Sequence, residues 1–100
     1  MTLFQINTST LEDLIIFFKN KARCFHSRSN ADRVWLVIQE RVTDYDMDPL
    51  KLALWHMQNE GSTADYEIFD FECDALLAHH KKYMKDTSRI LTKMYLEKRH

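Results

Sequence analysis

Apolar residues recur every three or four positions over most of this 100-residue chain, which is the period of an amphipathic helix. The apolar residues of the first periodic stretch are Leu11, Leu14, Ile15, Phe18, Ala22 and Phe25. At its start, residues 9–12 (STLE) have the order of a capping box, in which an acid at the third helical position reaches back to the cap. We therefore expect a helix over about residues 10–25, with Ser9 as its N-cap.

The second periodic stretch follows a polar turn at residues 27–30, where Ser29 or Asn30 can cap a helix. The residues that share its apolar face are Val34, Trp35, Ile38, Val42 and Tyr45. The run VWLVI at 34–38 also fits a buried strand, but nearby charges and the lack of a flanking glycine favour a helix over about 31–43. The opening segment, residues 2–8, is compatible with a short N-terminal strand or an extended segment.

A third helix is expected to begin where Asp48 precedes Pro49, because aspartate is a good N-cap and proline suits the first helical position. Its inner face is formed by Leu50, Ala53, Leu54 and Met57. We expect it to end before Gly61, the residue type that most readily adopts the left-handed conformation found after helices.

The last segment begins with a weaker capping pattern at residues 62–65 and has one apolar stripe over residues 66–96. The stripe that we expect to form the core or a dimer contact contains Phe69, Cys73, Leu77, His80, Met84, Thr87, Leu91 and Met94. It is flanked by Tyr66, Leu76, Tyr83, Ile90 and Tyr95. The stripe keeps its phase through residues 85–88, which favours one continuous helix over a break near Asp86–Ser88.

The chain contains one glycine and one proline, whereas average usage would give about seven and five. Sandwiches and barrels need frequent turn residues, so this scarcity favours helices and leaves no glycine-rich phosphate loop. Residues 1–100 are therefore expected to form a single all-α domain, a small bundle of about four helices with a long C-terminal amphipathic helix.

The last helix is too long for a compact domain of this size. Some 32 helical residues extend about 48 Å, whereas a compact 100-residue domain has a radius of gyration of about 13 Å. If the helix does not break, its end projects with an uncovered apolar face. We expect a second copy of the chain to cover that face, in an intertwined or antiparallel homodimer.

Net charge is −1 but is unevenly distributed: +2 over residues 1–43, −8 over 44–76 and +5 over 77–100. The charged residues that we consider as partner-binding candidates are Asp44, Asp46, Glu67, Asp70, Asp74, Lys81, Lys82, Lys85, Arg89 and Lys93. The basic end can be interpreted as a phosphate-binding surface, and the acidic middle as a mimic of nucleic acid. The favoured interpretation is simpler, since acids near a helix N-terminus and bases near its C-terminus stabilise the helix dipole.

No residue pattern indicates a metal site, a cofactor or catalysis. Adjacent His79 and His80 diverge by about 100° on a helix, and Cys73 lies about 10 Å along the axis from His80. His80 is better explained as a polar residue within the stripe that sets helix register. Cys24 and His26 point to different faces and are not a nucleophile–base pair.

The two cysteines lack a disulfide-framework spacing, and the N-terminus lacks the features of a signal peptide. The longest apolar runs are far shorter than a membrane span. We therefore expect a cytoplasmic protein with free thiols and no membrane segment.

These features favour a non-enzymatic protein that binds other proteins: a small regulator, adaptor or inhibitor, with a nucleic-acid-processing enzyme as one candidate target. The alternative is a nucleic-acid-binding regulator that uses the basic C-terminal face. The sequence pI of about 6.5 disfavours the alternative, because nucleic-acid-binding domains are usually more basic.

Overall fold

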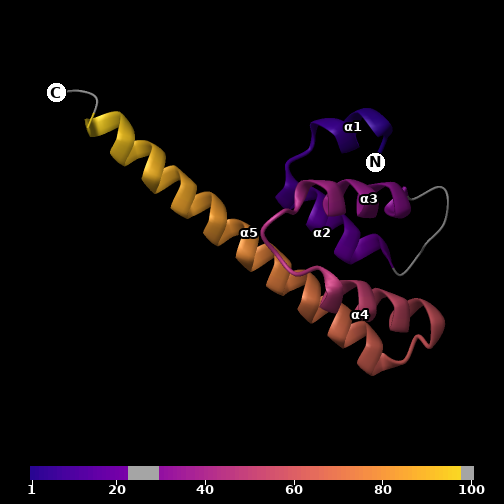
Figure 1. Cartoon of the computed structure of the whole chain (residues 1–100). Coiled ribbons are helices and arrows are strands. Elements are labelled where there is room, and N and C mark those ends of the chain that lie inside the picture. Colours follow the sequence, from indigo (N-terminus) through magenta and orange to yellow (C-terminus); the bar gives the residue numbers. More distant parts are fainter. Residues whose placement is uncertain (23–29, 98–100) are drawn as a thin grey trace.

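The computed structural model describes residues 1–22 and 30–97, with the side chain of Glu97 excluded. The described residues form five helices and no strand, so the expected all-α class is confirmed (Figure 1). The helices are α1 (Leu3–Thr8), α2 (Leu11–Lys21), α3 (Ala31–Arg41), α4 (Asp48–Asn59) and α5 (Thr63–Glu97).

The opening segment is a helix, and the prediction of a strand or extended segment there was wrong. Thr2 caps α1, because its hydroxyl oxygen accepts a hydrogen bond from the Gln5 backbone N–H at 3.2 Å. The Gln5 side-chain oxygen accepts in return from the Thr2 backbone N–H at 2.8 Å, which completes a capping box. This local signal, together with burial of Ile6, outweighs the short length of the segment.

Ser9 is not the N-cap of α2, because α1 occupies the residues immediately before it. Ser9 ends α1, and its hydroxyl donates to the carbonyl of Gln5. The cap is Thr10, whose hydroxyl oxygen accepts from the backbone N–H of Asp13 at 3.2 Å. α2 extends to Lys21, and residues 23–25 of the expected helix lie outside the described residues.

Residues 34–38 belong to α3, so the helical alternative is confirmed for the VWLVI run. Val34 and Ile38 are buried, while Leu36 is exposed, as expected for one inward face. The helix begins at Asn30, a left-handed residue with φ 55° whose side-chain amide donates to the carbonyl of Met1. α3 ends at Arg41, two residues before the predicted end.

α4 starts one residue earlier than predicted, since Asp48 is already helical. The backbone N–H of Asp48 donates to the Asp46 carboxylate at 3.0 Å, so Asp46 satisfies the amide that would otherwise lack a partner. At the other end, Gly61 has φ 66°, which confirms the predicted left-handed turn. Ser62 and Asp65 then form the predicted cap of α5, with backbone-to-side-chain hydrogen bonds of 3.2 and 3.0 Å.

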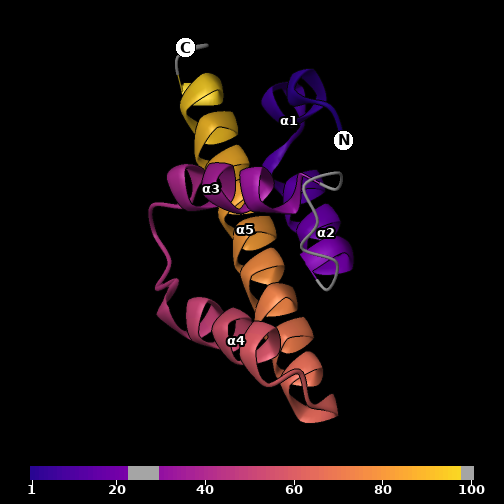
Figure 2. The same ribbon diagram turned by 90° about the vertical axis from the view of Figure 1, so that its right-hand side faces the viewer.

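The core lies between α2, α3, α4 and the first half of α5. Phe18 of α2 is its centre: its ring stacks on Trp35 of α3 at 4.9 Å between centroids and meets Phe69 of α5 edge-on at 5.6 Å. α4 folds back along the first part of α5, as the two views in Figures 1 and 2 show. Burial along α5 ends at Leu76, the last fully buried residue of the helix.

α5 continues without a break through residues 86–88, so the alternative of a broken helix was wrong. Its 35 residues correspond to about 52 Å, and the molecule measures 59 × 29 × 17 Å. The second half of α5 projects away from the other helices (Figure 1). Residues 81–97 are called the arm below, and the remainder of the described chain is called the body.

Candidate interaction site

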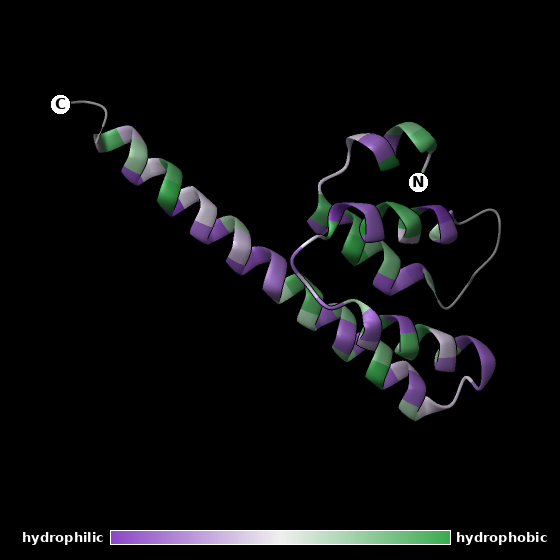
Figure 3. Ribbon diagram, viewed as in Figure 1, coloured by the Kyte–Doolittle hydropathy of each residue, from purple (hydrophilic) through white to green (hydrophobic). Residues whose placement is uncertain are grey.

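The apolar stripe of α5 is buried in the body and uncovered on the arm. Phe69, Cys73 and Leu76 are at most 1% exposed, and Leu77 and His80 are partly buried. Beyond them, the large side chains of the stripe are exposed by half or more: Tyr83 50%, Met84 53%, Ile90 60%, Leu91 61%, Met94 50% and Tyr95 63%. Thr87 lies among them and is half-buried. Figure 3 shows apolar residues continuing along the arm, and beyond its base no other described helix lies against it.

These six large residues together with Thr87 are called the arm stripe. With about 200 Å² of surface per large side chain, half-exposure of the six gives roughly 600 Å² of apolar surface. The largest apolar patch of a typical monomer is about 300–600 Å², and patches at this limit are commonly interaction sites. The arm stripe is therefore the main candidate interaction site.

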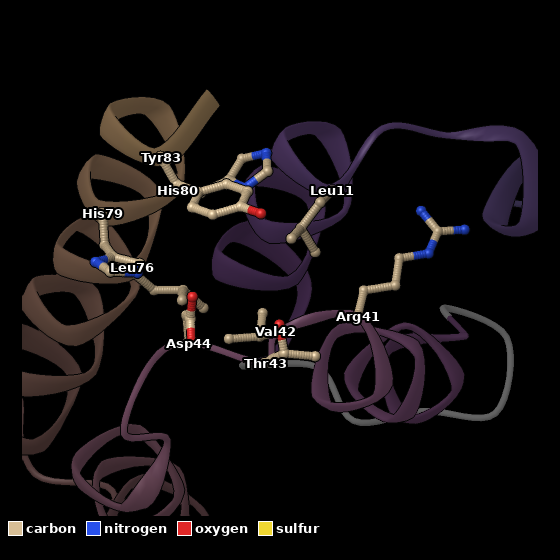
Figure 4. A pocket seen from close by; sticks show the side chains of 9 residues that line it. All are labelled: Leu11, Arg41, Val42, Thr43, Asp44, Leu76, His79, His80 and Tyr83. Carbon is tan, nitrogen blue, oxygen red and sulfur yellow. The ribbon is translucent and has the colours of Figure 1, made fainter. Parts of the chain in front are cut away.

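A pocket of about 90 Å³ opens at the base of the arm, where the stripe leaves the body (Figure 4). Its lining comes from α2, the end of α3 with the α3–α4 connection, and α5: Leu11, Arg41, Val42, Thr43, Asp44, Leu76, His79, His80 and Tyr83. In Figure 4 the side chains of His80 and Tyr83 extend from α5 toward Leu11. The pocket is therefore a hollow at the end of the arm stripe and is continuous with it through Tyr83.

The edge of the pocket is polar. The ring of Tyr45 lies 4.9 Å from that of His79, and burial together with the nearby carboxylates of Glu72 and Asp46 raises the pKa of Tyr45. Arg41 is turned away from the pocket, since its guanidinium donates to the carbonyls of Ser9 at 2.8 Å and Asn7 at 3.3 Å. Asp44, the first residue of the acidic segment 44–76, is an exposed charged group at this edge.

Two of the predicted partner-binding residues form ion pairs within the chain. Asp74 accepts a hydrogen bond from Lys19 at 2.8 Å, which raises the pKa of that lysine. Lys81 lies 3.5 Å from the Glu12 carboxylate, so both pairs join α2 to α5. These contacts give Asp74 and Lys81 a role in docking α5 on the body.

The remaining charged candidates are placed differently. Asp46 accepts a hydrogen bond from the Asp48 backbone N–H at the start of α4, and Asp70 is half-buried. The exposed candidates are Asp44, Glu67, Lys82, Lys85, Arg89 and Lys93. At 100° per residue, the four basic residues of this set lie on the side of the arm opposite the arm stripe. The arm therefore has one apolar side and one basic side.

Eight large apolar side chains of the body are exposed, and four of them lie on α4 and the first half of α5: Leu52, Trp55, Ile68 and Phe71. Each lies outside the inner stripe of its helix. The signal for the α5 pair was present, since Ala64, Ile68, Phe71, Ala75 and Ala78 repeat at alternating spacings of four and three. This second, weaker stripe lies on the outer side of α5.

Among the described residues, one group could hold a metal ion: His56, Glu60 and Asp65, whose ligand atoms lie within 4.8 Å of one another at the α4–α5 turn. One imidazole and two carboxylates can ligate a divalent cation. However, His56 already lies 3.6 Å from Glu60 and Asp65 accepts from Ser62, whose hydrogen bonds lower the pKa of Asp65. Helical spacing within one segment does not reveal this group, because its members come from the end of α4 and the start of α5.

Cys73 is poorly suited to catalysis or metal binding. It is a free thiol, 1% exposed, and burial raises its pKa to about 12. A thiol with this pKa stays protonated at neutral pH, whereas nucleophiles and metal ligands are thiolates. Cys73 therefore acts as a small apolar residue of the core.

Comparison with known proteins gives no further guide, because no protein-family model, curated protein or solved structure matches the chain. None of the described helices combines the length and the apolar character needed to cross a membrane. Function must therefore be inferred from the arm and the surfaces beside it.

Proposed function

We propose that this chain is a non-enzymatic interaction protein, a small regulator, adaptor or inhibitor that acts by binding other proteins. The observation that supports the proposal is the arm: one continuous helix that carries the core stripe out of the body and leaves it uncovered. A projecting apolar face of this size is stabilised by a protein surface that covers it. We place this activity in the cytoplasm, in keeping with the free thiol of Cys73.

The acidic segment, residues 44–76, is the second surface in this proposal. It has nine acidic residues and one basic residue, a net charge of −8, and includes exposed Asp44 and Glu67. A dense acidic surface on a small protein can occupy the basic groove of a nucleic-acid-processing enzyme. Such an enzyme is the kind of target that we propose for an inhibitory role.

Affinity capture from the native host tests the proposal when variants are compared. The wild-type chain should retain one protein in stoichiometric amount, and Asp44→Lys combined with Glu67→Lys should lose it if the acidic surface makes the contact. The charge-matched control is Lys51→Glu combined with Lys82→Glu, which changes the same number of charges in the opposite direction. Failure of the wild type to retain any protein would contradict the proposal.

A nucleic-acid-binding regulator is the second candidate, and the basic side of the arm favours it. Lys82, Lys85, Arg89 and Lys93 are exposed along one side of a projecting helix. Binding through phosphate contacts would weaken steeply as salt rises, because each contact releases counterions. A gel-shift assay at low salt, with Lys85→Glu combined with Arg89→Glu as the variant pair, separates this candidate from the first.

A further inference from the structure

We propose that the arm stripe is covered by the arm of a second copy of this chain, in an antiparallel pair that places the tip of each arm at the basal pocket of the other. This inference rests on the proposed function, since it names the partner of the surface on which that function depends.

The spacing of the arm stripe is that of a helix–helix seam. Leu77 and His80 at the end of the body are followed by four residues of the arm stripe at alternating intervals of three and four: Met84, Thr87, Leu91 and Met94. This is the heptad spacing that lets one helix pack along another, with side chains of each fitting between those of its partner. Because it continues from the part of α5 that is buried in the body, the arm presents a seam that is already suited to a helix.

The length of the arm fits a second arm. The body partly buries α5 as far as His80, and α5 ends at Glu97. The part of α5 that the body does not cover is therefore about 25 Å long. If two arms overlap antiparallel over this length, the whole of both stripes is covered. The tip of each arm, with Met94 and Tyr95, then lies beside the pocket at the base of the other, which is lined by Leu11, Leu76 and Tyr83.

The body excludes the parallel arrangement. In the first half of α5 the stripe side is occupied by the packed core, where Phe69 and Cys73 are buried. α5 is straight in both views (Figures 1 and 2), so parallel pairing of two arms would bring the two bodies to the same end, where each body occupies the stripe side along which the partner's α5 would continue. Antiparallel pairing places the bodies at opposite ends of the seam.

Charge favours the same orientation. Residues 81–96 contain five basic residues and one acidic residue, a net charge of +4, while residues 44–76 of the body carry −8. In the antiparallel pair the basic tip of each arm lies beside the partner's body, which contains the acidic segment 44–76. In a parallel pair the two basic tips lie side by side, and like charges repel.

The area is sufficient for a specific contact. Two arm stripes of roughly 600 Å² bury roughly 1,200 Å² in total, which is the lower limit of standard interfaces, before the pocket contact is added. The interface should therefore dissociate on dilution.

The antiparallel register pairs different positions of the two arms across the two-fold axis. Met84 lies opposite Met94 of the partner subunit, and Thr87 lies opposite the partner's Leu91.

Sedimentation velocity of the purified full-length chain over a range of concentrations tests the pairing. We expect a species of twice the chain mass of 12.0 kDa that gives way to the single chain on dilution. Leu91→Glu should shift the protein to the single-chain mass, and Met84→Glu provides a second variant. Both residues are exposed in the isolated chain, so circular dichroism should show an unchanged fold. Thr92→Glu adds the same charge beside Leu91 but off the stripe, and it should leave the mass unchanged.

Disulfide formation with oxidised glutathione tests the orientation, in a Cys24→Ser background. Met84→Cys and Met94→Cys are prepared as separate proteins. In the antiparallel pair, identical positions are about ten residues or 15 Å apart, too far for a disulfide. Neither variant alone should crosslink, whereas an equimolar mixture of the two should. Crosslinking of each variant alone would overturn the antiparallel arrangement.

A single-chain mass at all concentrations, a larger assembly than two chains, or an unchanged mass for Leu91→Glu would overturn the inference. None of these results bears on capture of another protein through Asp44 and Glu67. The two proposals can therefore fail separately.

Discussion

Phe69 should be one of the most important residues for the stability of the body, and a second phenylalanine on the same helix provides the control. The Phe69 side chain is 0% exposed and meets the Phe18 ring edge-on at 5.6 Å, whereas Phe71 is 68% exposed. Replacing Phe69 with alanine removes a fully buried ring and leaves a cavity, which costs about 3–5 kcal/mol. Replacing Phe71 with alanine removes little buried area and should change the free energy of unfolding by less than about 0.5 kcal/mol.

The two substitutions change helix propensity equally, so their difference reports burial alone. Urea unfolding followed by circular dichroism, at one fixed protein concentration, measures it. Domains of this size are stable by about 5–15 kcal/mol, so Phe69→Ala can unfold the chain outright. Phe69→Leu, with an expected loss of about 1–1.5 kcal/mol, then provides the comparison. Equal losses for the Phe69 and Phe71 variants would refute the packing described for α5.

The turn, the cap and the buried thiol give three further predictions. Gly61→Ala should lower the free energy of unfolding by about 1–2 kcal/mol because φ is 66° there, and Gly61→Asn should lower it less, as urea unfolding can show. Ser62→Ala should cost about 1 kcal/mol through loss of the α5 cap, with Thr63→Ala as the control in the same assay. The folded pKa of Cys73 is about 12 against a usual 9.0, so stability should fall as pH rises through that window. In a Cys24→Ser protein, Ellman's reagent should modify Cys73 slowly at pH 8 and rapidly in urea, and equal rates would contradict its burial.

Periodic apolar spacing predicted α2, α3, α4 and α5 because burial is the main determinant of helices in a chain of this size. Gly61 marked its turn correctly, since few residues other than glycine adopt a left-handed conformation readily. α1 was missed because its signal is not periodic. The capping box between Thr2 and Gln5 and a single buried residue, Ile6, hold it in place. The same omission shifted the predicted cap of α2 from Thr10 to Ser9.

The candidate site was only partly predictable. The length of α5 indicated that part of its apolar stripe is uncovered. The point at which burial ends depends on how the other helices pack, so the stripe alone could not identify Leu76 as the last fully buried residue. The ion pairs of Asp74 with Lys19 and of Lys81 with Glu12 join residues more than fifty positions apart, which a charge pattern along the chain does not reveal. The basal pocket likewise requires three separate segments to meet.

The continuity of α5 from the body into the arm has a consequence for how the arm forms. An isolated helix of 17 residues must first nucleate, because forming its first turn is unfavourable, and isolated helices of about this length are marginally stable in water. In this chain the body has already formed that turn, so the arm only adds residues to an existing helix. Its amide hydrogens should exchange progressively faster from Lys81 toward Glu97, as the end frays. The arm can therefore shorten or lengthen without unfolding the body, and a surface that binds its tip would favour the extended form.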